Sequence, residues 1–230
     1  MNHPTFPHKS SEARGKKGVI PDEDAHCLYA VHSKHHCYPF QPLLQVTCIF
    51  TWGGVTYPYH RKYSPSDPWS NKSWAQVKNG IGTSPSGIPD KENYFIGLDR
   101  LHELVSQAEY LNHIFSMYNG WSMFASAFYK NFTVGPESSD YELRYNTYYW
   151  LANPADDGLQ VKVAPTVFST FDHDPNGCAA QKYAAGWYGS DKCLGFSMFA
   201  DPMYWPVFEY RWQVNEMIFN LIRTSNFYEG

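Results

Sequence analysis

The chain has 230 residues, of which 17% are charged and 18% aromatic, and a formal net charge of −4 at pH 7. A chain of this length can bury roughly 70% of its surface in one domain, and its composition excludes a largely disordered protein. The net negative charge argues against a broad basic surface for nucleic acid, so we expect no nucleic-acid partner.

The first 26 residues are predicted to form a flexible polar tail. They contain Lys16, Lys17 and the acidic run Asp22-Glu23-Asp24, but no periodic apolar pattern and no apolar stretch that could serve as a secretion signal. Residues 114–129 form the longest conspicuous uncharged run, which is shorter than the roughly 20 apolar residues that a membrane-spanning helix needs. We therefore expect no membrane span, and no secretion signal within these residues.

One strand and two helices are predicted in the first half of the chain. Residues 43–51 are dense in apolar and β-branched side chains and stop at Gly53-Gly54, which is typical of a strand that enters a turn. Residues 73–78 fit a short helix ended by Asn79-Gly80. In residues 97–107 apolar side chains recur at helical spacing, with Asp99 in the first turn, so this is the clearest helix.

Strand periodicity dominates the middle of the chain. In residues 121–125 and 141–145, larger side chains alternate with smaller or polar ones, which predicts an antiparallel sheet. After about Pro165 the spacing of Gly, Pro, Asp and aromatic residues is typical of loops, until residues 213–223 give a last strand. The predicted fold class is therefore α+β, with a central antiparallel sheet, short flanking helices and a loop-rich C-terminal part.

The sequence lacks the common catalytic motifs. His102-Glu103 begins a zinc-protease motif, but Ser106 stands where the second His is needed. There is no nucleophile elbow, phosphate-binding loop or dinucleotide loop. A Ser/His/acid triad assembled from distant segments stays open, because geometry and not sequence order defines it. We expect a protein that is not an enzyme.

One cluster of histidines could ligate zinc or copper. His32, His35, His36 and Cys37 lie within six positions, and neutral imidazoles beside a thiol suit these metals. The solvating residues between them favour a polar surface loop instead, and the sequence identifies no further ligand.

A second candidate metal site precedes Cys178. Asp172 and Asp174 stand two positions apart before Pro175-Asn176-Gly177, and carboxylate oxygens in a tight loop are the ligands that calcium requires. Turns rich in Asp, Asn, Pro and Gly also form without a metal. The residues alone leave both interpretations open.

The cysteines and two sequons favour an extracellular protein. The spacing of the five cysteines lacks the CxxC pairs of zinc or redox sites and suggests two local disulfides and one leftover thiol. The sequons Asn71-Lys72-Ser73 and Asn131-Phe132-Thr133 predict N-glycosylation of Asn71 and Asn131. The five cysteines are Cys27, Cys37, Cys48, Cys178 and Cys193.

Short motifs in a fixed order run from about Cys27 to Arg223. They include Trp52-Gly53-Gly54, Tyr94-Phe95-Ile96-Gly97-Leu98-Asp99-Arg100-Leu101-His102, Cys178-Ala179, Gly186-Trp187-Tyr188 and Asn215-Glu216-Met217. In this order the chain resembles the fibrinogen C-terminal, or fibrinogen-related, domain of ficolins and tachylectins. The resemblance implies one such domain over residues 27–230 after the tail 1–26, with an N-terminal subdomain 27–68, a central sheet subdomain 69–165 and a loop-rich subdomain 166–230 for ligand and calcium.

The resemblance implies two disulfides, Cys27–Cys48 and Cys178–Cys193. Cys37 is then left over, which in a secreted protein points to pairing with another chain or to a free thiol. Pairing of Cys37 with Cys48, which would free Cys27, is the alternative.

Members of this family bind acetylated sugars or similar groups in a pocket of the C-terminal loops, beside calcium. Carried over, the calcium ligands are Asp172 and Asp174, although the loop before Cys178 is shorter than usual and lacks a further acid. The family commonly has a cis peptide bond before the second cysteine of this pair and a His after it, whereas this chain has Lys192 and Leu194 there. The ligand-binding residues carried over are Tyr183, Trp187, Tyr188, Lys192 and Cys193.

Three functions compete at this stage. The first is a secreted, lectin-like recognition protein that binds acetylated glycans through its C-terminal loops. The second is a structural subunit of an extracellular oligomer that has lost the sugar site, with Cys37 as the candidate interchain cysteine. The third, an enzyme, has only unassigned His and acidic residues in its favour.

Overall fold

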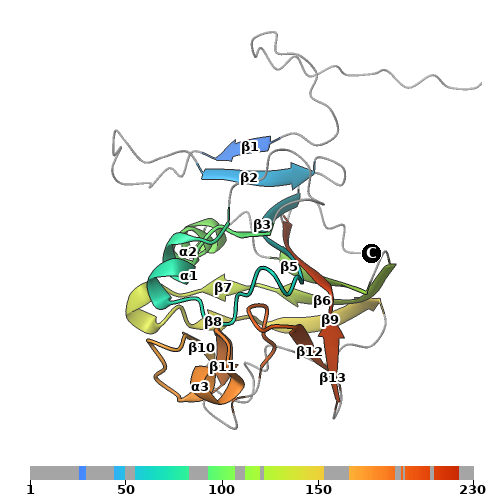
Figure 1. Cartoon of the computed structure of the whole chain (residues 1–230). Helices are drawn as coiled ribbons and strands as arrows, with labels where there is room; N and C mark the ends of the chain where they lie inside the picture. Colours follow the sequence, from blue (N-terminus) through green and yellow to red (C-terminus); the bar gives the residue numbers. More distant parts are fainter. Residues whose placement is uncertain are drawn as a thin grey trace, which may run out of the picture.

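The computed structural model describes residues 26–29, 44–49, 55–82, 93–106, 112–119, 122–152, 166–189, 193, 195–207 and 210–222. These residues form antiparallel sheets with short helices beside them, so the predicted α+β fold class is confirmed (Figure 1). The helical elements are α1 (Trp74–Asn79), α2 (Leu98–Ser106), the 3-10 turn η2 (Glu137–Ser139) and α3 (Cys178–Lys182).

The largest sheet is built from distant parts of the chain. Its strands are β1 (His26–Tyr29), β2 (Leu44–Ile49), β3 (Val55–Lys62), β4 (Tyr94–Phe95), β5 (Asn112–Asn119), β6 (Ser122–Lys130), β9 (Thr147–Ala152) and β14 (Glu216–Ile222). Within the described residues the order is β1-β2-β3-β14-β5-β6-β9, with β4 paired to β3. Ile218 of β14 lies opposite His60 of β3 on one side and Ser116 of β5 on the other. The C-terminal strand therefore joins all three predicted subdomains in one sheet.

Two smaller sheets complete the described part. One contains β7 (Thr133–Val134), β8 (Leu143–Arg144), β10 (Thr166–Ser169) and β11 (Gly186–Gly189) in the order β11-β10-β8-β7, and the other pairs β12 (Met203–Val207) with β13 (Tyr210–Val214). The C-terminal part thus has more regular structure than its sequence predicts. Its described elements before β14 have four or five residues each, too few to show a helical or strand period.

Local sequence explains both predicted helices. Ser73 caps α1 in a capping box with Gln76, and Gly80, at φ +110°, ends the helix in a conformation that favours glycine. The apolar face of α2 is fully packed into the core. The residues of that face are Leu98, Leu101, Leu104 and Val105.

Aromatic side chains build much of the core. The rings of Tyr59, Trp69, Phe95 and Phe199 pack together with centroid distances of 5.5–6.3 Å, mostly edge to face. Such pairs contribute about 0.5–1.5 kcal/mol beyond the area that they bury. These rings come from β3, the segment after it, β4 and the C-terminal part, so the high aromatic content serves to join the subdomains.

Several predictions lie outside the described residues. The histidine cluster, Cys37 and residues 1–25 of the predicted tail are among them, whereas His26, the last residue of that tail, is the first residue of β1. The backbones of β1 and β2 pair antiparallel with Cys27 opposite Val46, but the side chains of Cys27 and Cys48, and hence their disulfide, are not described. In the part of the chain that is described, no helix has the length and apolar character needed to cross a bilayer.

A largely buried hydrogen bond between neighbouring strands predicts acid sensitivity. The ring nitrogen Nε2 of His60 lies 2.8 Å from Oε1 of Glu216, and this hydrogen bond lowers the pKa of Glu216 although burial opposes the shift. A carboxyl group with a lowered folded-state pKa stabilises the fold above its unfolded pKa of about 4.3 and loses that contribution as the pH falls through the folded value.

We therefore expect the free energy of unfolding to fall on acidification below about pH 5, with on the order of 1 kcal/mol of the loss due to Glu216. Urea unfolding at several pH values measures this. In Glu216→Gln that part of the fall should be absent; the same pH dependence in both proteins would contradict the assignment.

Candidate functional site

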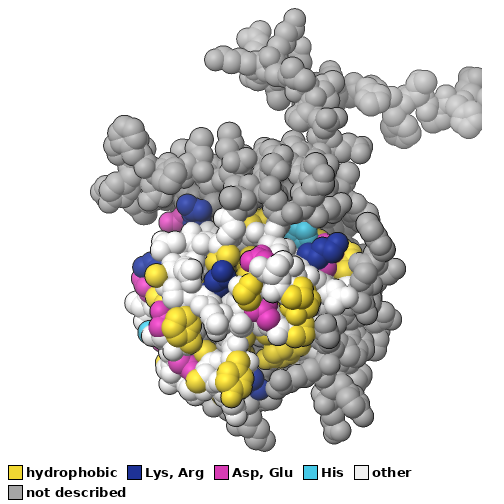
Figure 2. Space-filling model, viewed as in Figure 1, with side chains coloured by type: hydrophobic (Ala, Val, Ile, Leu, Met, Phe, Trp, Pro, Cys, Tyr) yellow, Lys and Arg dark blue, Asp and Glu magenta, His cyan; other side chains and the backbone are white. Residues whose placement is uncertain are grey.

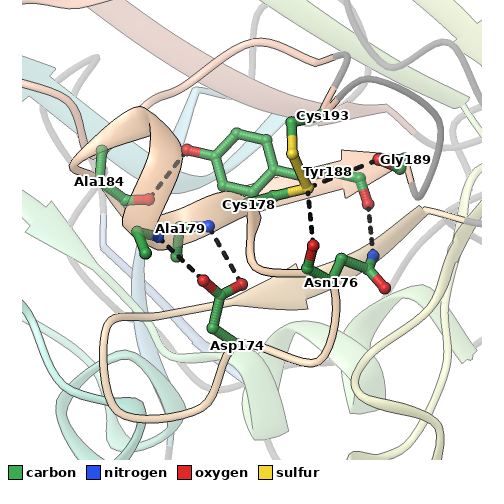
Figure 3. Close-up of a disulfide and its surroundings, with 9 residues drawn as sticks. Asp174, Asn176, Cys178, Ala179, Ala184, Tyr188, Gly189 and Cys193 are labelled. Atoms are coloured by element: carbon green, nitrogen blue, oxygen red, sulfur yellow. Dashed lines mark hydrogen bonds between the residues drawn. A yellow bond between two sulfur atoms is a disulfide. The ribbon is translucent and has the colours of Figure 1, made fainter.

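The predicted disulfide Cys178–Cys193 is confirmed, and it organises the candidate site. Cys178 is the first residue of α3, and its Cα lies 5.2 Å from that of Cys193 (Figure 3). The two cysteines are buried with Ala179 and Tyr188 in a small apolar cluster separate from the main core. The bond therefore fixes the start of α3 next to β11.

The Asp174 carboxylate caps α3. Its two oxygens accept hydrogen bonds from the backbone N–H groups of Ala179 and Ala180, at 3.1 and 2.9 Å (Figure 3). A carboxylate at this place accepts hydrogen bonds from otherwise free N–H groups of the first helical turn. Its negative charge also interacts favourably with the positive end of the helix dipole. Asp174 thus has a structural use that needs no metal.

Asp172 lies in a tight turn that contacts α1. An antiparallel β-bridge between Thr170 and His173 closes the turn. Within it, Oδ1 of Asp172 accepts hydrogen bonds from the Trp74 backbone N–H at 2.8 Å and from the Thr170 hydroxyl at 2.7 Å. Burial raises the pKa of Asp172, but several effects that include these two hydrogen bonds outweigh it and lower the pKa below its ordinary value. His173 packs its ring on Trp74 and bonds Asp140, so the turn is held from two sides.

The carboxylates of Asp172 and Asp174 fit this hydrogen-bonded turn better than a calcium site. Three of their four oxygens already accept hydrogen bonds from the protein. Among the described residues no group of three His, Cys, Asp or Glu side chains could hold a metal ion. Calcium binding here stays a prediction.

Two of the predicted ligand-binding residues are buried. Trp187 and Tyr188 are both 0% exposed, although neighbouring residues of a strand point to opposite faces. Trp187 faces the main core, where its indole N–H donates to the Tyr141 carbonyl at 2.9 Å. Tyr188 faces the disulfide cluster, and its hydroxyl donates to the Ala184 carbonyl at 2.9 Å (Figure 3). Both faces of β11 are covered, so neither ring offers a surface to a ligand.

Tyr183 has the opposite environment. It follows α3 as its C-cap and is 84% exposed. Its φ of +55° is in the left-handed region, which bulky residues rarely adopt. Its hydroxyl forms no hydrogen bond with a described residue. Among the predicted ligand-binding residues that the structure describes, Tyr183 is therefore the one with an exposed side chain.

Phe171 was not predicted as a binding residue. It lies beside Asp172 in the turn after β10 and is 61% exposed. In the sequence, Phe171 stands out as an aromatic residue in a short polar turn, which offers no apolar core for its ring to pack against. Figure 2 shows hydrophobic side chains among acidic ones over the region where Figure 1 places α3, β10 and β11.

Of the two remaining predicted ligand-binding residues, Lys192 lies outside the described residues, and Cys193 is buried in its disulfide. Asn71 and Asn131 are both exposed. Gly195 lies so close to β11 that an added Cβ would stand 2.5 Å from the Trp187 carbonyl oxygen, which explains the glycine there.

Comparison with known proteins agrees with the observed fold. The family described as fibrinogen beta and gamma chains, C-terminal globular domain, matches residues 28–215. The chain belongs to the fibrinogen C-terminal domain family. Fibrinogen-like protein 1 of Bos taurus is 28% identical over 170 residues, which are 66% of this chain and 52% of that protein. The fibrinogen gamma chain of Rattus norvegicus is 30% identical over 140 residues, or 53% of this chain and 30% of that one.

Solved structures show the same fold. The fibrinogen-like globe domain of human ANGPTL6 superposes with a TM-score of 0.62 at 22% identity, covering 86% of this chain and 88% of that chain. Lamprey fibrin D-dimer, complexed with the peptide Gly-His-Arg-Pro-amide, gives 0.66 at 21% identity, with 83% and 68% coverage. The chain spans about half or less of the two curated relatives named above, so the activities of those whole proteins do not transfer to it.

Proposed function

We propose that this fibrinogen C-terminal domain is an extracellular recognition module, and that it binds acetylated glycans through the surface around α3 with Tyr183 as the main contact. Family membership and the Cys178–Cys193 disulfide support the extracellular location. The single observation that carries the site is the exposure of Tyr183 on left-handed backbone beside a disulfide-fixed helix.

The left-handed backbone conformation of Tyr183 is unfavourable for folding. A non-glycine residue in this region costs about 1–2 kcal/mol, and a ring that is 84% exposed buries little surface to offset that cost. Such outliers concentrate at binding sites. An exposed tyrosine ring can stack on the apolar face of a sugar or on an acetyl methyl group, while its hydroxyl exchanges hydrogen bonds with ligand polar groups.

Removing this strain gives a first prediction for Tyr183. Tyr183→Gly should raise the free energy of unfolding by about 1 kcal/mol, because glycine adopts this φ without a steric penalty. The gain will be reduced by the greater freedom of glycine in the unfolded chain. Urea unfolding measures it; a clear loss of stability would show that the Tyr183 ring supports the fold.

The experiment for the proposed function is binding of the purified chain to a glycan array, with calcium and then with EDTA, and with N-acetylglucosamine as competitor. We expect binding that the acetylated sugar displaces and that survives EDTA, because the Asp172 and Asp174 oxygens serve the turn. Binding abolished by EDTA would restore calcium to the site. No binding by folded protein in either buffer would contradict the glycan proposal.

A second candidate function is assembly into an extracellular oligomer. The observation that favours it is Phe171, a large apolar ring at 61% exposure on the same subdomain. Exposed aromatic side chains favour protein contacts as well as small ligands. Light scattering with and without reductant tests it: an oligomer that Phe171→Ser weakens supports assembly, and a monomer at all concentrations contradicts it.

A further inference from the structure

We propose that Asn131 is the principal N-glycan attachment site of the folded chain, in preference to Asn71. Both residues lie in Asn-x-Ser/Thr sequons and both are exposed, so the sequence and the exposure alone do not separate them. The environment of each sequon does separate the two residues. This inference concerns a modification and is independent of the ligand proposed above.

The sequon at Asn131 presents its acceptor groups outward. Asn131 forms the turn between β6 and β7 at φ +53°, a conformation that asparagine adopts more readily than most residues. Phe132 is fully buried and anchors the turn, while Asn131 and Thr133 on either side of it are exposed. No described residue hydrogen-bonds the Asn131 amide or the Thr133 hydroxyl. Amide and hydroxyl are therefore both available to a glycosyltransferase.

In the sequon at Asn71, the hydroxyl group is already used to cap α1. The hydroxyl of its third residue, Ser73, accepts the backbone N–H of Gln76, and the Gln76 side chain in turn accepts the Ser73 N–H at 2.9 Å. This capping box spans only four residues, so it forms from local sequence. The backbone N–H of Trp74 is also engaged, with Asp172. Recognition of an Asn-x-Ser sequon uses the hydroxyl, so the helix cap competes with modification of Asn71.

A glycan on Asn131 would lie away from the candidate binding surface. Asn131 lies two residues before the start of β7, which is the last strand of the sheet β11-β10-β8-β7 within the described residues. The disulfide and α3 lie at the opposite end, beside β11. The carbohydrate would therefore hydrate the β7 end of the sheet and leave Tyr183 accessible.

The experiment is translation of the full chain, behind a cleavable leader, into endoplasmic-reticulum microsomes, followed by deglycosylation and by glycopeptide mass spectrometry. We expect Asn131 to be occupied in most molecules and Asn71 in a smaller share. Asn131→Gln should remove the main gel shift, whereas Asn71→Gln and the sequon-preserving Thr133→Ser should keep it.

Two results would overturn the proposal. One is an Asn131 peptide that stays unmodified while a reference glycoprotein in the same microsomes is glycosylated. The other is a main shift that Asn71→Gln removes and Asn131→Gln does not. Glycopeptide mass spectrometry of the natural chain reads the occupancy of each sequon directly, without a substitution that could alter folding.

Discussion

Replacement of Asp201 by Ala is expected to lower the free energy of unfolding by about 3–5 kcal/mol, because it leaves a buried cation without its counterion. The partner is Arg61, a fully buried residue of β3 whose guanidinium bonds the Asp201 carboxylate. The other Asp201 oxygen accepts the backbone N–H groups of Trp69 and Ser70 at 2.8 and 2.7 Å. Burial raises the pKa of Asp201, but the Ser70 N–H and the Arg61 charge outweigh it and keep the pKa below its ordinary value.

This network joins three segments of the chain. Arg61 also donates to the carbonyls of Met198 and Ala200 at 3.0 and 2.8 Å, and its guanidinium lies 5.0 Å from the centre of the Trp69 ring. Loss of Asp201 therefore removes contacts from β3, from the segment after it and from the C-terminal part together.

Urea unfolding of Asp201→Ala measures the effect, and Glu142→Ala is the matched control. Glu142 pairs with Arg144 at the surface, so its loss should change stability by no more than about 1 kcal/mol. Adding Arg61→Met to Asp201→Ala should recover part of the loss, since no buried charge then remains unpaired. A loss as small as that of the surface control would contradict this account of the network.

Tyr188→Ala is expected to destabilise the fold by about 3–5 kcal/mol, as other truncations of large buried aromatic residues do. Its ring packs beside the Cys178–Cys193 disulfide, and its hydroxyl bonds the Ala184 carbonyl. Burial also raises the pKa of Tyr188. The side chain thus holds the turn that follows α3, and any loss of ligand binding in this variant would follow from lost structure.

The control for this position is Tyr188→Phe, which keeps the ring and removes the hydrogen bond. It should lower the free energy of unfolding by about 1–3 kcal/mol, the cost of leaving the Ala184 carbonyl unsatisfied. Circular dichroism during thermal and urea unfolding separates the two variants. A Tyr188→Ala protein as stable as the natural chain would show that the ring is not part of the core.

The sequence predicted the elements that depend on local chemistry. The capping residues Ser73 and Gly80 set the bounds of α1, and the apolar period of residues 97–107 gave α2. The order of short motifs gave the family and, through it, the Cys178–Cys193 disulfide, which the structure contains.

The environment of the site residues could not be predicted in the same way. Trp187 and Tyr188 occupy positions next to each other in a strand, and a sequence does not show that both faces of this strand are covered. The insertion of β14 between β3 and β5 likewise depends on contacts between residues far apart in the chain. Asp174 resembles a calcium ligand until the structure places α3 directly beside it.

The most direct test of the proposed site is a titration of an N-acetylglucosamine-bearing surface with the natural chain, Tyr183→Phe and Tyr183→Gly, each shown to be folded. Because the ring is 84% exposed, we expect Tyr183→Gly to bind at least tenfold more weakly, while Tyr183→Phe keeps most of the affinity. Binding by Tyr183→Gly equal to that of the natural chain would contradict the assignment of Tyr183 as the main contact.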